Sequence, residues 1–201
     1  MGEDITAKEK ISKTAFELFV ERSYENVSLE EIAERSDLSK GAIFHYFNSK
    51  YDLAVNCLID HFEAIKKSSF GEIERYEDPE EKLEKTIDMS FELFIKRPKF
   101  TRFVLEIYEI GAKREEKQEE LEVIEILSQF IKETEDIFKE LKIPDPRARS
   151  HLLWAVVDGI ALQYYVWEED PELPDKDDLK DDIYKMFSNR FEIEIERGDE
   201  H

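Results

Sequence analysis

Apolar residues recur along most of the chain at intervals of three and four positions, which is the period of one face of an α-helix. Polar, proline-containing or glycine-containing breaks separate these stretches, and the 6 Gly and 6 Pro disfavour a turn-rich all-β fold. The pattern predicts an all-α protein of about nine helices. The expected helices cover residues 6–22, 28–36, 39–47, 48–70, 79–96, 98–111, 116–141, 147–168 and a last one from 175 onward.

Polar side chains mark where the first helices begin and end. Ser28, with Glu31 three residues later, predicts a capping box at the start of the second helix. Asp37 is suited to the left-handed or turn conformation that would end it. Two short helices joined by a tight turn predict either a helix-turn-helix, at about residues 29–48, or a piece of a larger helical bundle. Spacing alone leaves both interpretations open.

The stretch from Ser39 to Lys50, SKGAIFHYFNSK, is the segment around which the rest of the chain is organised. Ser39 is a natural N-cap, and Asn48-Ser49 end this helix and cap the next one. Helical periodicity predicts that Ile43, Phe44 and Phe47 point inward. The same periodicity predicts four outward positions, Lys40, Ala42, His45 and Tyr46.

The order of residues from Tyr24 to Leu53 resembles the N-terminal DNA-binding domain of the TetR family of transcriptional regulators. That family typically shows a Thr or Ser cap, an Ile-Ala pair, a turn, and then Ser-x-Gly-x-aliphatic-Tyr-x-His/Tyr-Phe-x-x-Lys-x-x-Leu. Two positions depart from the pattern, since Asp37 replaces the usual Gly of the turn and Phe44 replaces the usual Tyr. The matching positions are Ser28, Ile32, Ala33, Ser39, Gly41, Ile43, Tyr46, Phe47, Lys50 and Leu53.

The resemblance implies a DNA-binding domain at residues 6–66. Without a side chain, Gly41 would let the helix start approach the DNA backbone closely, while Tyr46 and Lys50 occupy phosphate-contacting positions of the family. His45 could equally be a solvated surface residue, and Tyr46 a core aromatic. The implied DNA-binding residues are Ser28, Ser39, Lys40, Gly41, Ala42, His45, Tyr46 and Lys50.

The remaining chain, residues 67–195, is expected to be an effector-binding and dimerisation domain. The segment 155–167 is apolar on all sides, so it lies either in the centre of its domain or at an oligomer interface. The resemblance implies that the last two long helices pair in a homodimer, which would let two recognition helices read a palindrome. The interface candidates, each of which could instead be intrachain core, are Val156, Ile160, Tyr164, Ile183 and Phe187.

The resemblance also implies a pocket for a small effector whose binding releases operator DNA, so the predicted function is a ligand-responsive repressor. The apolar helices carry no cluster of Arg or Lys, which favours a hydrophobic, possibly acyl-type effector over a phosphate-rich one. A drug-like aromatic or cationic compound, met by a carboxylate, remains an alternative. The pocket candidates are Phe62, Phe91, Phe94, Phe103, Tyr108, Phe130, Trp154, Asp158 and Tyr165.

The net charge of −21 opposes nonspecific binding to nucleic acid by the chain as a whole. Residues 1–55 hold 7 Lys and Arg against 11 Asp and Glu, so even the expected DNA-binding part is not basic. Its few cations must therefore be well placed. The lone Cys57 and the lack of a long apolar stretch or signal peptide predict a cytoplasmic protein without a membrane span.

The sequence lacks the motifs that catalysis would need. It contains no Glu-x-x-His or His-x-x-x-His pair and no glycine-rich phosphate loop, and its 4 His are scattered. We therefore predict no catalytic residue, no cofactor and no metal site. The competing interpretation is a helical interaction or adaptor protein that binds no DNA, with a helical-bundle enzyme as the less favoured alternative.

Overall fold

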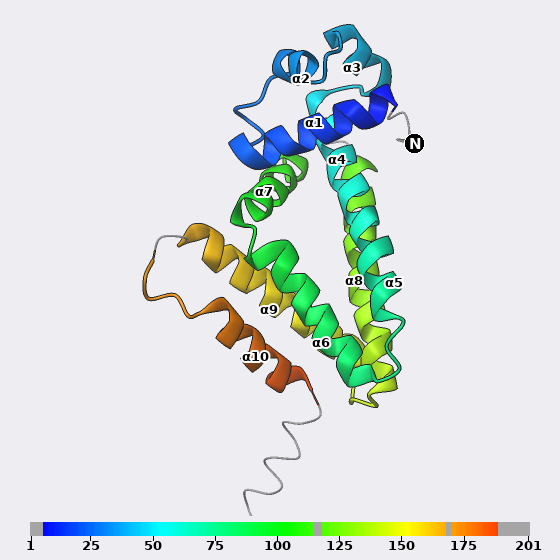
Figure 1. Ribbon diagram of the computed structural model, residues 1–201, viewed down its shortest axis with the longest axis vertical. Coiled ribbons are helices and arrows are strands. Elements are labelled where there is room, and N and C mark those ends of the chain that lie inside the picture. Colours follow the sequence, from blue (N-terminus) through cyan, green and yellow to red (C-terminus); the bar gives the residue numbers. More distant parts are fainter. Residues whose placement is uncertain (1–5, 115–117, 168–169, 189–201) are drawn as a thin grey trace, which may run out of the picture. The chain divides into compact units, whose positions relative to one another are not determined.

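The computed structural model describes residues 6–114, 118–167 and 170–188, and these residues form nine continuous helical segments without a strand (Figure 1). This confirms the all-α prediction. None of the described helices is long and apolar enough to cross a membrane. The segments are α1 (Ala7–Arg22), α2 (Leu29–Arg35), α3 (Lys40–Tyr46), α4 (Lys50–Ile65) continued by η1 (Lys66–Phe70) and α5 (Gly71–Ile73), α6 (Pro79–Ser90) continued by η2 (Phe91–Ile95), α7 (Pro98–Ala112), α8 (Gln118–Glu140), α9 (Pro146–Val166) and α10 (Lys176–Phe187).

The chain divides into two compact units. Unit 1 consists of residues 1–64 and 99–126, and unit 2 of residues 65–98 and 127–201. Residues 99–126, which the sequence analysis places in the second domain, thus cluster with the first three helices. The reason is aromatic packing and polar contact: the Phe103 ring stacks on Phe19 at 5.3 Å between centroids, and the Arg102 Nη2 donates to the Val20 carbonyl at 2.7 Å.

In unit 1, α2 and α3 lie side by side against α1 (Figure 1). Their inward residues are fully buried and make one apolar core with α4 and α7, which is the main stabilising term for such a unit. The core therefore fixes how α3 is presented. Its largest buried side chains are Ile11, Leu18, Phe19, Ile32, Ile43, Phe47, Phe62, Phe100 and Phe103.

The turn between α2 and α3 forms as the sequence predicts. Asp37 has φ 55°, in the left-handed region, which confirms its role as the turn residue that replaces the family's usual Gly. The Leu38 N–H donates to the Ala33 carbonyl at 2.9 Å, a pattern that closes the end of a helix whose next residue is left-handed.

The starts of α2 and α4 agree only in part with the caps predicted from the sequence. Ser28 Oγ accepts the Glu31 N–H at 3.1 Å, but the Glu31 carboxylate bonds to Arg22 at the end of α1 instead of returning to Ser28. The predicted capping box of α2 is therefore half formed, because a cation competes for its carboxylate. At α4, Ser49 Oγ accepts the Asp52 N–H at 3.0 Å, which confirms the predicted cap.

The fourth helical segment runs further than predicted. Gly71 was expected to end it, but Gly71 keeps a helical φ of −63° and the segment continues to Ile73 through the π-helical turn η1. Phe70 and Ile73 are buried at this last turn.

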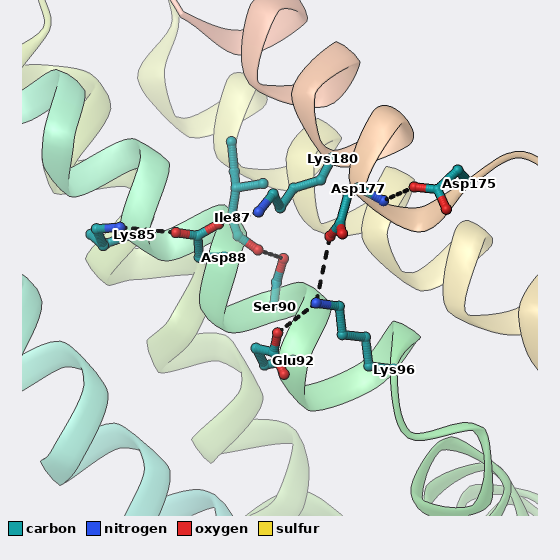
Figure 2. A network of polar contacts seen from close by, with 9 residues as sticks. All are labelled: Lys85, Ile87, Asp88, Ser90, Glu92, Lys96, Asp175, Asp177 and Lys180. Carbon is teal, nitrogen blue, oxygen red and sulfur yellow. Dashed lines mark hydrogen bonds and ion pairs between the residues drawn. The ribbon is translucent and has the colours of Figure 1, made fainter.

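In unit 2, ion pairs fasten α10 to α6 and η2 (Figure 2). Lys180 Nζ lies 2.8 Å from Asp88, which Lys85 also contacts at 3.0 Å. Lys96 Nζ lies 3.5 Å from Asp177. These ion pairs thus hold one side of the acidic face of α10 to α6 and η2. Ile183 and Phe187 of α10 are buried beneath it.

Candidate nucleic-acid interface

Helix α3 presents a mixed polar and aromatic face from unit 1. Ile43 and Phe47 are buried, as predicted, but Phe44 is 51% exposed, so the prediction that it points inward is wrong. Each helical residue turns about 100°, and Phe44 follows Lys40 by four positions, which places both on the same outward face. The Lys40 Nζ lies 5.9 Å from the centroid of the Phe44 ring.

Gly41 lies at the start of α3, and the fold itself does not require a glycine there. A Cβ added to it would meet only Ser39 Oγ at 3.7 Å, an ordinary van der Waals distance, and its φ is not positive. Neither packing within the chain nor backbone conformation therefore requires a glycine at this position.

Ser39, His45 and Tyr46 are all exposed around this helix. Ser39 Oγ accepts the Ala42 N–H at 3.1 Å and so fixes the first turn. Tyr46 is 42% exposed and packs edge-on against His45 at 4.8 Å, which rules out the alternative that it is a core aromatic. Ser28 is likewise exposed at the start of α2.

The two lysines of the predicted interface already have partners within unit 1. Lys40 Nζ is ion-paired with Glu30 of α2. Lys50 Nζ lies 4.2 Å from the centroid of the Tyr24 ring and 3.5 Å from the Glu25 carbonyl oxygen. Desolvation lowers the pKa of Lys50, while the charges of Glu25 and Glu106 oppose the shift.

Glu106 of α7 is a residue that sequence reasoning missed. Its Oε2 accepts the Tyr24 N–H at 2.7 Å, and its Oε1 lies 3.7 Å from Arg102 Nε. It thereby supports the turn that carries the Tyr24 ring under Lys50. No local signal could reveal it, because α7 is separated from this turn by about eighty positions of sequence and lies outside the resemblance.

Unit 1 also contains an open pocket of about 490 Å³ between α1 and α4. Phe16 and His61 stack along it at 4.4 Å, and burial raises the pKa of the Cys57 thiol, which makes that thiol a poor nucleophile. In the part of the chain that the structure describes, no group of three or more His, Cys, Asp or Glu is arranged to hold a metal ion. The pocket is lined by Glu9, Ser12, Lys13, Phe16, Cys57, Asp60, His61 and Ala64.

The predicted effector-pocket residues fall into both units. Phe62, Phe103 and Tyr108 belong to unit 1, and the other six belong to unit 2. Three of those six come together, since the rings of Phe94 and Phe130 lie 6.5 Å and 5.8 Å from Trp154. Asp158, by contrast, is exposed on α9. Phe91 and Tyr165 are the remaining two of the six residues in unit 2.

The cluster around Trp154 includes a ring that the sequence analysis did not select. Phe70 lies 5.4 Å from Phe130. The Trp154 Nε1 donates to Thr134 Oγ1 at 3.0 Å, so its polar atom is satisfied inside the core. Phe94 and Phe70 belong to the two π-helical turns, local departures from α-helical geometry that are often found at functional sites.

The predicted dimer-interface residues are mostly core residues of unit 2. Ile160, Tyr164, Ile183 and Phe187 are each at most 9% exposed within one chain, and Val156 is half-buried. Such side chains have little surface left for a partner. A helix that is apolar all round shows no single face in its sequence, so its inward and outward positions cannot be told apart from the sequence alone.

Residues 11–57 match the family model described as bacterial regulatory proteins, tetR family. A curated relative is the biofilm operon icaADBC HTH-type negative transcriptional regulator IcaR of Staphylococcus aureus, 33% identical over 61 residues. The similar stretch is 29% of this chain and 33% of IcaR, so the chain spans about a third of that relative's length.

Solved structures resemble nearly the whole chain in fold. FadR from Bacillus subtilis, in complex with stearoyl-CoA, aligns with a TM-score of 0.70 at 16% identity, covering 90% of this chain and 97% of that one. A transcriptional regulator from Saccharomonospora viridis, in complex with choline, aligns with a TM-score of 0.76 at 16% identity, covering 88% and 93%. Residues 11–57, which include the helix-turn-helix, thus match the tetR family of bacterial regulatory proteins, and the rest of the chain shares the fold of these regulators.

Proposed function

We propose that the chain is a non-enzymatic repressor that binds a palindromic operator as a homodimer and releases it when a small effector binds. The observation that carries the DNA-binding part is the face of α3. There Gly41 is unexplained by the fold, and Phe44 and Tyr46 are large side chains left open to solvent. A short helix with a small residue near its start and exposed Lys and aromatic groups suits the major groove, where apolar groups meet thymine methyls.

For the dimer, we propose a contact along the exposed seam of α9. The seam consists of Leu152, Ala155, Gly159, Leu162 and Val166, all exposed and spaced by three and four positions as in helices that pack in pairs. Leu152 and Val166 are 56% and 58% exposed, which is unusual for such side chains unless they meet a partner.

The seam is also self-complementary. Leu152 and Val166 each lie seven residues from Gly159, so an antiparallel pair of α9 helices with its two-fold axis at Gly159 brings Leu152 of one chain to Val166 of the other. Ala155 and Gly159 are small and let the two backbones approach closely at the centre. The seam lies beside three of the interface candidates from the sequence, Val156, Ile160 and Tyr164, on the same helix.

For the effector, we propose a hydrophobic compound held in unit 2 near Phe94, Phe130 and Trp154. Support comes from the aromatic cluster at the π-helical turns and from the stearoyl-CoA bound by FadR of Bacillus subtilis. The choline bound by the Saccharomonospora viridis regulator supports the cationic alternative, since a cation can stack on these rings.

Fluorescence anisotropy tests the DNA-binding part of the proposal. The wild-type chain selects a duplex from a random-sequence pool, and its affinity for that duplex is measured against a scrambled duplex over a range of salt. We expect saturable binding that weakens steeply with salt, because Lys and Arg replace the counterions of the phosphates. Lys50→Ala should weaken binding, whereas Lys113→Ala, an equal charge change at an exposed position near the end of α7, should not.

Failure to select any duplex, with the protein folded and free of effector, would contradict the proposal and favour the adaptor interpretation. Adding stearoyl-CoA or choline to the bound complex tests the effector part. The compound that binds the free chain should also release the duplex, and by linkage the duplex should weaken binding of that compound by the same factor.

A further inference from the structure

Lys40, the cation at the start of α3, is already ion-paired with a carboxylate of the same chain. We propose that Glu30 acts as an internal counter-ion for Lys40, which operator phosphates must displace, so that operator binding is coupled to uptake of a proton or a cation by Glu30. The inference rests on the proposed DNA-binding function. It assigns a regulatory role to a residue of α2 that is not itself predicted to touch DNA.

The pair has the geometry of an exchangeable contact. Lys40 is the first residue of α3 and Glu30 the second residue of α2, and their side chains are 46% and 66% exposed. Exposed ion pairs of this kind are weak, because water and salt screen them and two long side chains must be ordered. A phosphate can therefore take Lys40 from Glu30 without opening the core beneath.

The exchange leaves an uncompensated carboxylate beside the DNA. Once Lys40 turns to a phosphate, Glu30 loses its partner and gains a negative neighbour. Like charges repel, and the repulsion is relieved when the carboxylate takes up a proton or a cation from solution. The balance of −4 in residues 1–55 means that few other positive groups are at hand to relieve it.

The direction of the pH effect follows from the two states. In the free chain, the hydrogen bond from Lys40 lowers the pKa of Glu30. In the complex, the pKa must be higher, because the lysine is gone and a phosphate is near. As the pH falls toward the usual pKa of Glu, about 4.3, the complex thus binds more protons than the free chain. The affinity for DNA therefore increases as the pH falls.

Other ionisable or charged groups lie near Glu30, and their effects on DNA binding must be distinguished from that of Glu30. Glu31 is occupied by Arg22, and Glu34 and Arg35 lie on the same helix. His45 of α3 is a further ionisable side chain on the proposed DNA-facing helix. The difference between the wild type and a Glu30 variant, measured over the same pH range, isolates the contribution of Glu30.

The test uses the selected duplex and four variants of the full chain, two of which complete a double-mutant cycle. Glu30→Gln keeps size and polarity but removes the charge, and Glu34→Gln makes the same charge change on the same helix at an exposed residue outside the described ion pairs. We expect Glu30→Gln to bind roughly three-fold more tightly and to steepen the salt dependence by up to about one unit of slope. Glu34→Gln should show a smaller effect on both.

A double-mutant cycle makes the inference specific to Lys40. In the Lys40→Ala background the gain from Glu30→Gln should be smaller, since no pair is left to break and only the repulsion between Glu30 and the DNA remains. The extra tightening of the wild type between pH 7 and pH 5 should likewise be smaller in Glu30→Gln. Equal effects of Glu30→Gln and Glu34→Gln, or a gain that is undiminished without Lys40, would overturn the inference while DNA binding stands. Loss of DNA binding by the wild type would instead overturn the proposed function.

Discussion

The outward face of α3 in unit 1 and the seam of α9 in unit 2 can be compared directly. Each is an exposed helical face with a glycine that the chain's own packing does not require. A Cβ at Gly41 would find its nearest neighbour at 3.7 Å, and one at Gly159 would find nothing within 4 Å. In a helix interior, glycine destabilises by about 1 kcal/mol relative to alanine, so neither glycine stabilises its helix.

The two faces differ in what would approach them. The α3 face carries Lys40, His45 and Tyr46, groups that suit a charged and hydrated surface such as DNA. The α9 seam is apolar, with Leu152 and Val166 at its ends, and suits another apolar surface such as its own copy. The chemistry of the side chains around each glycine thus indicates the kind of partner that we propose for each face.

The largest expected effect is at the α9 seam. Gly159→Arg places a long cation on the proposed two-fold axis, where it would meet its own copy. Because the position has open space in one chain, the variant should fold normally and sediment as a monomer. Operator affinity should fall by about 100-fold or more, since two half-sites no longer bind as one unit. Ala112→Arg, which adds the same charge at an exposed position of α7, is the control, and a Gly159→Arg variant that remains dimeric would contradict the seam.

The next effect is at the α3 face. Gly41→Ala should leave the fold intact and raise the free energy of unfolding by up to about 1 kcal/mol, because alanine favours the helix. Operator affinity should nevertheless fall by about ten-fold, a cost of about 1.4 kcal/mol, if the DNA backbone comes close to this position. Gly71→Ala is the matched control, because Gly71 is also helical and also has open space. Unchanged operator affinity in Gly41→Ala would remove the main support for the interface.

The same comparison explains how much could be predicted from the sequence. The α3 segment has local sequence signals at its ends, which are Ser39, Asp37 and Ser49. Each of these residues forms the cap or turn that its side chain predicts. Long helices follow from periodicity in the same way. These features depend on residues within a few positions of one another, which a sequence displays directly.

The features that the sequence does not predict depend on contacts between residues far apart in the chain. Phe44 was assigned inward because apolar residues usually are, but its orientation is set by how α3 packs on α1 and α2. Glu106 supports Tyr24 from a distant helix. On α9 every face is apolar, so only the packing of unit 2 shows that Ile160 is buried and Gly159 exposed.

A smaller effect tests whether the turn before α3 is set by backbone conformation. Asp37→Val should lower the free energy of unfolding by about 1–2 kcal/mol, because a β-branched residue is strained at φ 55°. Asp37→Gly should be neutral or stabilising, since glycine adopts this conformation freely. Chemical denaturation of the two variants measures the difference, and equal stability would mean that the turn relaxes around the new side chain.

The smallest expected effect comes from breaking the ion pairs that hold α10. It tests whether α10 is independent of the α9 seam. Desolvation raises the pKa of Asp88, but hydrogen bonds from Lys180 and Lys85 outweigh it and hold the pKa below its usual range (Figure 2). A lowered carboxyl pKa stabilises the folded state above the usual Asp value of about 3.9, and that contribution is lost as the pH falls through the folded-state pKa. Asp88→Asn should therefore lower the free energy of unfolding at pH 7 by no more than about 1 kcal/mol, as expected of an exposed ion pair.

The difference between Asp88→Asn and the wild type should shrink as the pH is lowered below about 4, where the wild-type carboxyl is also neutral. Sedimentation should show both proteins equally dimeric at pH 7, because the network joins α10 to α6 and η2 while the seam lies on the exposed face of α9. If Asp88→Asn weakened the dimer as strongly as Gly159→Arg, the position of α10 would have to be part of the interface, and the seam would extend from α9 to the exposed Met186 of α10.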